Sequence, residues 1–88
     1  MNRLNLFRTA NESAERLLLT YPDSVALKSV MAQLRYLIDV EAGVSEDTSK
    51  LGQINIGVLA AKEIEDMDAG VAEELYAVTA EVKKMLRQ

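Results

Sequence analysis

The sequence predicts an all-α fold, a compact antiparallel bundle of about four helices. Apolar residues recur at spacings of three and four along nearly the whole chain, which places them on one side of a helix. Sustained alternation of apolar and polar residues, the pattern of a half-buried strand, does not occur in the sequence. Short connections favour antiparallel neighbours. Helix starts and stops divide the single expected domain, 1–88, into four predicted helices: 3–20, 24–42, 48–64 and 69–87.

The first two predicted helices are separated by a proline turn. Pro22 disfavours helical backbone at Tyr21, so the first helix has to end there. Asp23 or Ser24 can cap the amides that open the second helix, and Gly43 suits the left-handed position after its last turn. The two predicted buried stripes are Leu4, Phe7, Ala10, Ala14, Leu17, Leu18 and Tyr21, then Leu27, Val30, Met31, Leu34, Leu37 and Ile38.

The third predicted helix, 48–64, follows a short polar loop, with Ser45 or Asp47 as its N-cap. We expect Gly57 inside this helix to mark the close approach of a neighbouring helix or side chain, with a helix kink as the second interpretation, since glycine costs about 1 kcal/mol there against alanine. The predicted buried face comprises Leu51, Ile54, Val58, Leu59 and Ala61, with Ile56 and Ile64 near its edges.

The fourth predicted helix, 69–87, begins after an acidic turn, with Asp66 or Asp68 as its cap. Acidic residues lie in its early turns and basic residues in its last turn, the order that the helix dipole favours. Its predicted stripe is Val71, Leu75, Val78, Val82, Met85 and Leu86.

Composition argues against an enzyme. The chain has no histidine and no cysteine, so it lacks the commonest general base, the commonest transition-metal ligand and any thiolate nucleophile. The acidic residues do not follow the alternating layout of a calcium loop. We therefore expect no catalytic residue, no metal site and no cofactor.

Charge and hydropathy also limit the partners. The net charge of −4 and the pI near 4.7 argue against nucleic acid, whose phosphates require clustered lysine and arginine. No apolar run approaches the ~20 residues of a membrane span, and Arg8 interrupts the N-terminal apolar stretch that a signal peptide would need. The sequence therefore predicts a cytoplasmic protein without a membrane partner.

The acidic turn at the end of the third helix is the main candidate interaction site. Ten acidic residues and two lysines lie between Asp39 and Glu74, which gives this part a net charge of −8 and the rest of the chain +4. One interpretation is a solvated surface with capping carboxylates. The other is a negative patch that steers onto a basic partner surface. The carboxylates concerned are Glu63, Glu65, Asp66 and Asp68.

Three further side chains are candidate contacts. Tyr36 and Tyr76 lie at the edges of their helical stripes, where a tyrosine either packs its ring against the core or anchors an interface. Met67 stands alone among acids, either as an exposed apolar contact or packed back at the start of the fourth helix.

The centre of the sequence carries a set of short motifs at consistent spacing: Tyr21-Pro22, Gln33-Leu34, Tyr36, Gly57 to Ile64, Glu65, Asp66 and Asp68. In these residues the sequence resembles small cytoplasmic immunity proteins that neutralise type VI secretion effector toxins of the NAD(P)+ glycohydrolase kind. The resemblance covers about two-thirds of the chain, from Tyr21 to Leu75. Where that family carries a proline at the start of the last helix, this chain has Ala69-Gly70, and its basic C-terminal end also departs from the family pattern.

This resemblance implies a non-enzymatic inhibitor that binds its cognate effector toxin domain in the cytoplasm and blocks the active site. The toxin would consume NAD(P)+ or a related nucleotide. Together with the charge pattern, it predicts these toxin-binding residues: Glu63, Glu65, Asp66, Met67, Asp68, Tyr36 and Tyr76.

The alternative interpretation is a helical adaptor or structural module that self-associates. Apolar residues at the stripe edges would form a homodimer interface if several of them were exposed together. These residues are Leu6, Leu19, Leu27, Val40, Ile56 and Ile64.

Overall fold

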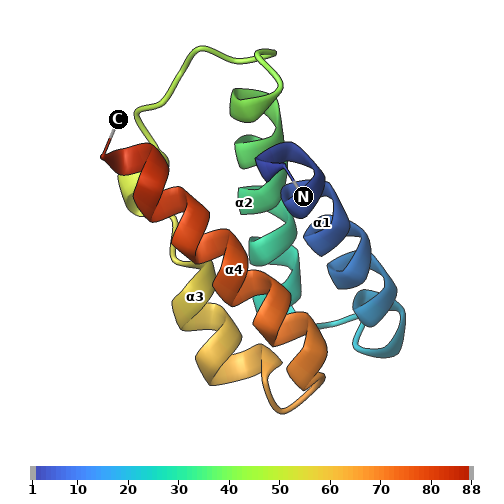
Figure 1. Ribbon diagram of the computed structural model, residues 1–88. Coiled ribbons are helices and arrows are strands. Elements are labelled where there is room, and N and C mark those ends of the chain that lie inside the picture. The colour runs from blue at the N-terminus through green and yellow to red at the C-terminus, as the bar shows by residue number, and fades with distance from the viewer. Residues whose placement is uncertain (1, 88) are drawn as a thin grey trace.

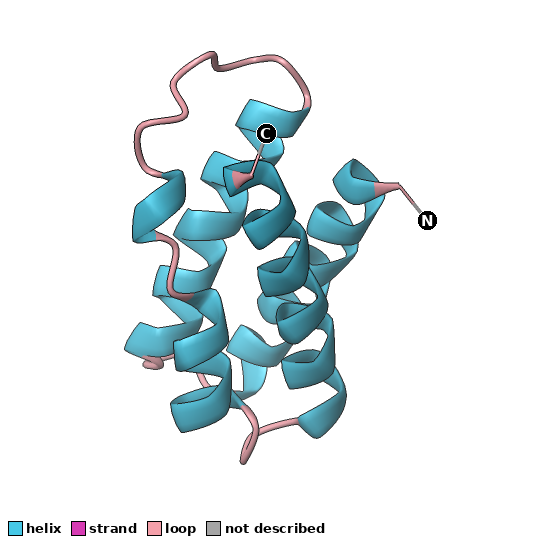
Figure 2. Cartoon of the chain, turned by 60° about the vertical axis from the view of Figure 1, so that its left-hand side comes forward, coloured by secondary structure: helices cyan, strands magenta, loops and turns pink. Residues whose placement is uncertain are grey.

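A computed structural model describes residues 2–87, which form helices and connecting loops without a strand (Figures 1 and 2). The predicted all-α fold is confirmed. Three long helices, α1, α2 and α4, pack with a shorter fourth segment made of α3 and η2. The elements are α1 Arg3–Thr20, α2 Val25–Glu41, the 3-10 turn η1 Leu51–Gln53, α3 Ile56–Leu59, the π-helical η2 Ala60–Ile64 and α4 Ala69–Leu86.

The predicted signals at the ends of the long helices are confirmed. Ser24 Oγ accepts a hydrogen bond from the Leu27 amide at 3.1 Å and caps α2. Asp68 Oδ1 accepts one from the Val71 amide at 3.1 Å and caps α4. Gly43 has a φ of +79° after the last turn of α2. The amides of residues 43 and 44 bond the carbonyls of residues 40 and 39, which is the Schellman arrangement.

One hydrophobic core joins all the helices. Leu86, predicted to be buried, is 53% exposed on the last turn of α4. The buried apolar residues are Phe7, Ala10, Ala14, Leu27, Val30, Leu34, Leu37, Leu51, Ile56, Ala60, Ile64, Ala72, Leu75, Val78, Val82 and Met85.

The prediction of one continuous helix over 48–64 is wrong. Residues 42–50 form a loop, η1 supplies a single 3-10 turn, and α3 begins only at Ile56. Ser45 and Asp47 therefore cap no helix. Ser45 Oγ accepts from the Asp47 amide at 3.2 Å, and Asp47 Oδ1 accepts from the Ser49 amide at 2.9 Å, so both side chains stabilise local turns instead.

The predicted buried face of the third helix is correct for Leu51, which is buried, and in part for Ile54 and Leu59, which pack against the core, but wrong for the rest. Ile56 and Ile64, expected at the edges, are fully buried, whereas Val58 is 51% exposed and Ala61 is exposed. Residues 56, 60 and 64 are spaced by four and share the face toward the core, and the last turn is π-helical, with the Glu65 amide bonded to the Ala60 carbonyl at 2.9 Å. A π turn takes more than four residues, so it keeps residues four apart on one face.

Gly57 marks a close helix contact, as predicted. A Cβ atom there would lie 2.9 Å from Thr79 Oγ1 and 3.1 Å from Thr79 Cγ2 on α4. Glycine therefore lets α3 approach α4 closely, and this contact sets the rotation of α3 about its axis.

The apolar surface expected for self-association is mostly absent from the outside of the bundle. Leu27, Ile56 and Ile64 belong to the core, and Leu6 and Val40 pack against it. Of the six residues considered, Leu19 alone is exposed, with 84% of its surface accessible. The stripe edges are covered because α3 is rotated from the predicted orientation and α2 packs closely on α1.

Within the described residues, every helix is too short or too polar to cross a membrane.

Candidate functional site

The chain folds so that the acidic residues at the end of α2 and in the loop 42–50 lie at one end of the bundle, and those of the turn 65–68, between η2 and α4, at the opposite end (Figures 1 and 2). The net charge of −8 in the linear sequence is therefore not one continuous patch. At the first end Arg3 pairs with Glu41 at 3.4 Å and with Glu81 at 3.2 Å, which partly neutralises it.

The second end, which we call the acidic end, is formed by residues 63–68. Glu63, Glu65, Asp66 and Asp68 are all exposed there. Within the described residues, these four carboxylates take part in no ion pair. Because no ion pair offsets the mutual repulsion of these carboxylates within the described residues, a basic partner surface would be attracted to them.

Tyr76 on α4 lies at the acidic end and contacts Glu65. Both residues were predicted as contacts of one site. Its hydroxyl donates a hydrogen bond of 2.7 Å to Glu65 Oε2, and the ring is 38% exposed. This hydrogen bond raises the pKa of the Tyr76 phenol above its usual value, with desolvation adding to the effect. The bond holds the Glu65 carboxylate over α4 and reduces the conformational entropy that binding would cost.

Asp66 and Asp68 have different positions in the turn. Asp68 caps α4, so its carboxylate already accepts a backbone hydrogen bond. Asp66 is exposed beside it. A partner can contact both, but removal of Asp68 would also weaken the start of α4.

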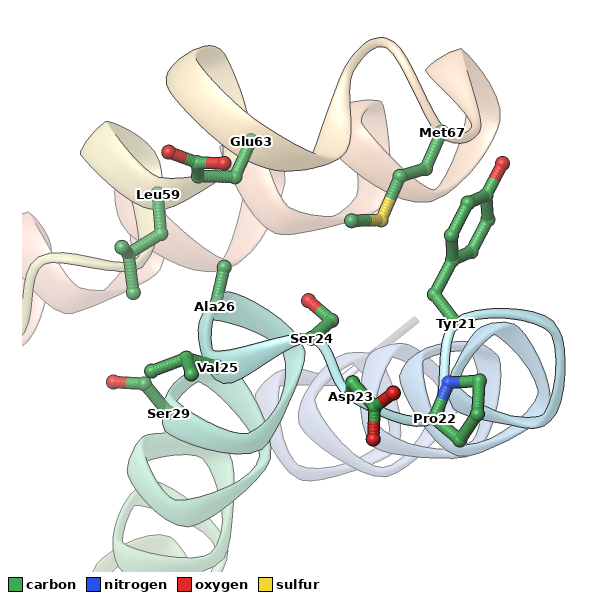
Figure 3. A pocket seen from close by; sticks show the side chains of 10 residues that line it. All are labelled: Tyr21, Pro22, Asp23, Ser24, Val25, Ala26, Ser29, Leu59, Glu63 and Met67. Carbon is green, nitrogen blue, oxygen red and sulfur yellow. The ribbon is translucent and has the colours of Figure 1, made fainter.

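Met67 and Glu63 line a groove between the start of α2 and the α3–η2 segment. Met67 is partly buried and packs against the core, so of its two predicted roles the packing role is the one observed. Figure 3 shows the Leu59 and Met67 side chains pointing across the gap toward α2, with the Tyr21 ring beside Met67. The groove has a volume of about 670 Å³ and is lined by Tyr21, Pro22, Asp23, Ser24, Val25, Ala26, Ser29, Leu59, Glu63 and Met67.

Tyr36 lies apart from the acidic end. Its hydroxyl donates to the Asp47 carbonyl at 2.9 Å and accepts from the Lys50 amide at 3.2 Å, so it fixes the loop 42–50. The structure thus brings together six of the seven predicted contact residues and separates the seventh.

Sequence reasoning missed the opposite wall of this groove. Val25, the first residue of α2, is 79% exposed. Tyr21, predicted on the buried stripe of the first helix, instead follows the end of α1 and is 38% exposed. The sequence did contain a signal for Val25. An apolar residue that directly follows an N-cap and lies off the buried stripe has no apolar partner within its own helix. Leu59 was expected in the core and instead lies at its margin, on the groove.

Outside the acidic end, two carboxylates have lowered pKa values. Hydrogen bonds from Lys84 and Arg3 lower the pKa of Glu81, and a hydrogen bond from Ser49 lowers that of Asp47. These are the ordinary effects of ion pairs and turns on exposed carboxylates. Over residues 2–87, the acidic side chains form no group that could hold a metal ion.

A family comparison identifies the class of protein. The model of the Tsi6 family matches residues 2–84, nearly the whole chain. The chain belongs to the Tsi6 family. Tsi6 proteins are type VI secretion immunity proteins, so membership implies binding to a cognate effector protein and a role other than catalysis. No curated protein and no solved structure matches this Tsi6-family chain.

Proposed function

We propose that this protein neutralises its cognate type VI effector in the cytoplasm of the producing cell by covering the effector's active site. The effector in this proposal consumes NAD(P)+ or a related nucleotide. The observation that carries the proposal is the acidic end, where four exposed carboxylates form no ion pair within the described residues.

Charge complementarity links this surface to a nucleotide-consuming toxin. A cleft that binds nucleotide phosphates is lined by basic side chains and backbone amides. Carboxylates that enter such a cleft replace the phosphates and exclude the nucleotide. Electrostatic attraction between the two surfaces also raises the association rate.

Side chains around the acidic end supply the other elements of a protein interface. Glu65 is oriented by Tyr76, and an exposed tyrosine ring is a favoured interface anchor. Met67 and Tyr21 provide apolar surface next to the carboxylates. A polar rim around apolar contacts is the usual anatomy of a specific complex.

A paired charge reversal tests the contact. The variant Glu65→Lys/Asp66→Lys is compared with Glu12→Lys/Glu46→Lys, which changes the net charge equally at exposed residues elsewhere on the surface. Asp68 is left intact because it caps α4. Loss of desolvated charge pairs costs about 2–5 kcal/mol, so we expect affinity for the effector toxin domain to fall about thirtyfold or more in the first variant only.

Calorimetry with the purified effector domain measures the affinity, and thermal melting confirms that both variants fold. Equal affinities of the two variants would show that the acidic end is not the contact. Competition with NAD(P)+ tests the active-site part separately. If saturating nucleotide leaves the apparent Kd unchanged, the inhibitor does not cover the nucleotide site.

A further inference from the structure

The groove at the acidic end continues along α2 into a second hollow. The second hollow, of about 290 Å³, is lined by Ser29, Ala32, Gln33, Tyr36, Lys50, Gln53 and Ile54. Ser29 lines both, so the two hollows lie next to each other along α2, and together we call them the α2 trench. It follows α2 from Val25 to Tyr36, about 16 Å at the rise of an α-helix. That length accommodates about five residues of an extended chain.

Hydrogen bonds hold the far part of the α2 trench in place. Gln33 Nε2 donates to Asn55 Oδ1 at 2.7 Å, and the Asn55 amide donates to Gln33 Oε1 at 2.9 Å. This reciprocal pair ties the start of α3 to α2. Tyr36 in turn bonds the backbone at Asp47 and Lys50. Because its walls are already ordered, the trench can receive a ligand without a large entropic cost.

The near part of the trench combines apolar walls with two carboxylates. Val25, Leu59 and Met67 provide the apolar surface, and Asp23 and Glu63 contribute the negative charges. Asp23 and Glu63 make no ion pair within the described residues. An arginine or lysine fits this combination because its aliphatic stem packs on apolar surface while its charged end meets a carboxylate.

We propose that the α2 trench receives a single segment of the effector that carries a lysine or arginine next to an apolar side chain. The cation lies by Asp23 and Glu63, the apolar side chain covers Val25, Leu59 and Met67, and the following residues run along α2 toward Gln33. This inference rests on the proposed function, since the occupant is the effector. It adds a second contact area, distinct from the carboxylates of Glu65 and Asp66.

Two exposed valines provide a matched test. Val25 is 79% exposed inside the trench, and Val44 is 77% exposed in the loop 42–50, outside it. Val25→Arg places both bulk and a competing cation in the trench, whereas Val44→Arg makes the same chemical change elsewhere. Ala32→Arg obstructs the second hollow, and Glu63→Gln removes one of the carboxylates proposed to meet the cation.

Affinity of each purified variant for the effector toxin domain is measured by calorimetry, with thermal melting as the check on folding. We expect Val25→Arg and Ala32→Arg to weaken binding about thirtyfold or more, as loss of a central anchor does, while Val44→Arg binds like the unaltered protein. Glu63→Gln is expected to weaken binding about tenfold, a typical effect of losing one charged partner.

The outcomes separate this inference from the proposed function. If Val25→Arg binds as tightly as Val44→Arg, the trench proposal is overturned and the immunity function stands. If only Ala32→Arg is without effect, the occupant stops in the first groove and the continuous trench is overturned. If the unaltered protein does not bind the effector, both proposals fail. Concentration-dependent dimerisation that Val25→Arg abolishes would show a second copy of this chain as the occupant and would overturn the proposal.

Discussion

Replacement of Gly57 by alanine is expected to destabilise the protein, although alanine is the better helix former. The new Cβ atom would lie 2.9 Å from Thr79 Oγ1 and 3.1 Å from Thr79 Cγ2, closer than nonbonded atoms tolerate. Thr79 cannot move away easily. It is branched at Cβ, and its hydroxyl donates to the Leu75 carbonyl at 3.0 Å.

The size of the effect follows from two opposing contributions. Overpacking of a close contact costs about 1–3 kcal/mol. The higher helix propensity of alanine returns up to about 1 kcal/mol. The expected net loss in the free energy of unfolding is therefore about 1 kcal/mol, with an upper bound of about 3 kcal/mol.

A double-mutant cycle with Thr79→Ala isolates the contact. That substitution removes both Oγ1 and Cγ2 and leaves only the Cβ atom of residue 79, which would lie 3.5 Å from the new Cβ atom at position 57, an ordinary van der Waals contact. In the Thr79→Ala background, Gly57→Ala is therefore expected to stabilise the protein by up to about 1 kcal/mol. The sign of the alanine effect thus reverses between the two backgrounds.

Urea unfolding followed by far-ultraviolet circular dichroism measures all four proteins of the cycle. Gly52→Ala is the control, because nothing lies within 4 Å of a Cβ atom at that position. The same Gly57→Ala effect in both backgrounds would refute the reasoning, since it would mean that Thr79 does not limit the approach of α3 to α4.

Three further predictions concern the cap, the loop and the ion pairs. Asp68→Ala should lower the free energy of unfolding by about 1 kcal/mol in urea denaturation, because the Val71 amide loses its cap. Tyr36→Phe should speed hydrogen exchange at the Lys50 amide, which loses its acceptor, and cost about 1 kcal/mol of stability. The pKa of Glu81 lies below its ordinary value of 4.5. The ionised Glu81 carboxylate therefore stabilises the folded protein fully above pH 4.5, and this contribution is lost as the pH falls through the lowered pKa. The stability difference between the unaltered protein and Glu81→Gln should therefore shrink in acid below that pH, as thermal melts at a series of pH values would show.

The candidate site was predictable from sequence in part. The density of carboxylates between Glu63 and Asp68 identified one wall of it, because charge in a single turn stays together in any helical fold. The hydrogen bond between Glu65 and Tyr76 joins residues eleven positions apart, and only the packing of η2 on α4 brings them together. The groove opposite Met67 needs the start of α2 as its second wall, and no local pattern predicts that pairing.

By itself, the sequence determined the three long helices and their ends. A proline, a glycine with positive φ and two capping side chains act through backbone groups a few residues away, so these signals do not depend on the fold. Tertiary packing alone decided the third segment. Its apolar residues offer two competing faces with helical spacing, one through Leu51, Ile54 and Val58 and the other through Ile56, Ala60 and Ile64. The contact of Gly57 with Thr79 and the π turn select the second face, because only that rotation lets α3 approach α4 closely and turns Glu63 and Leu59 toward α2.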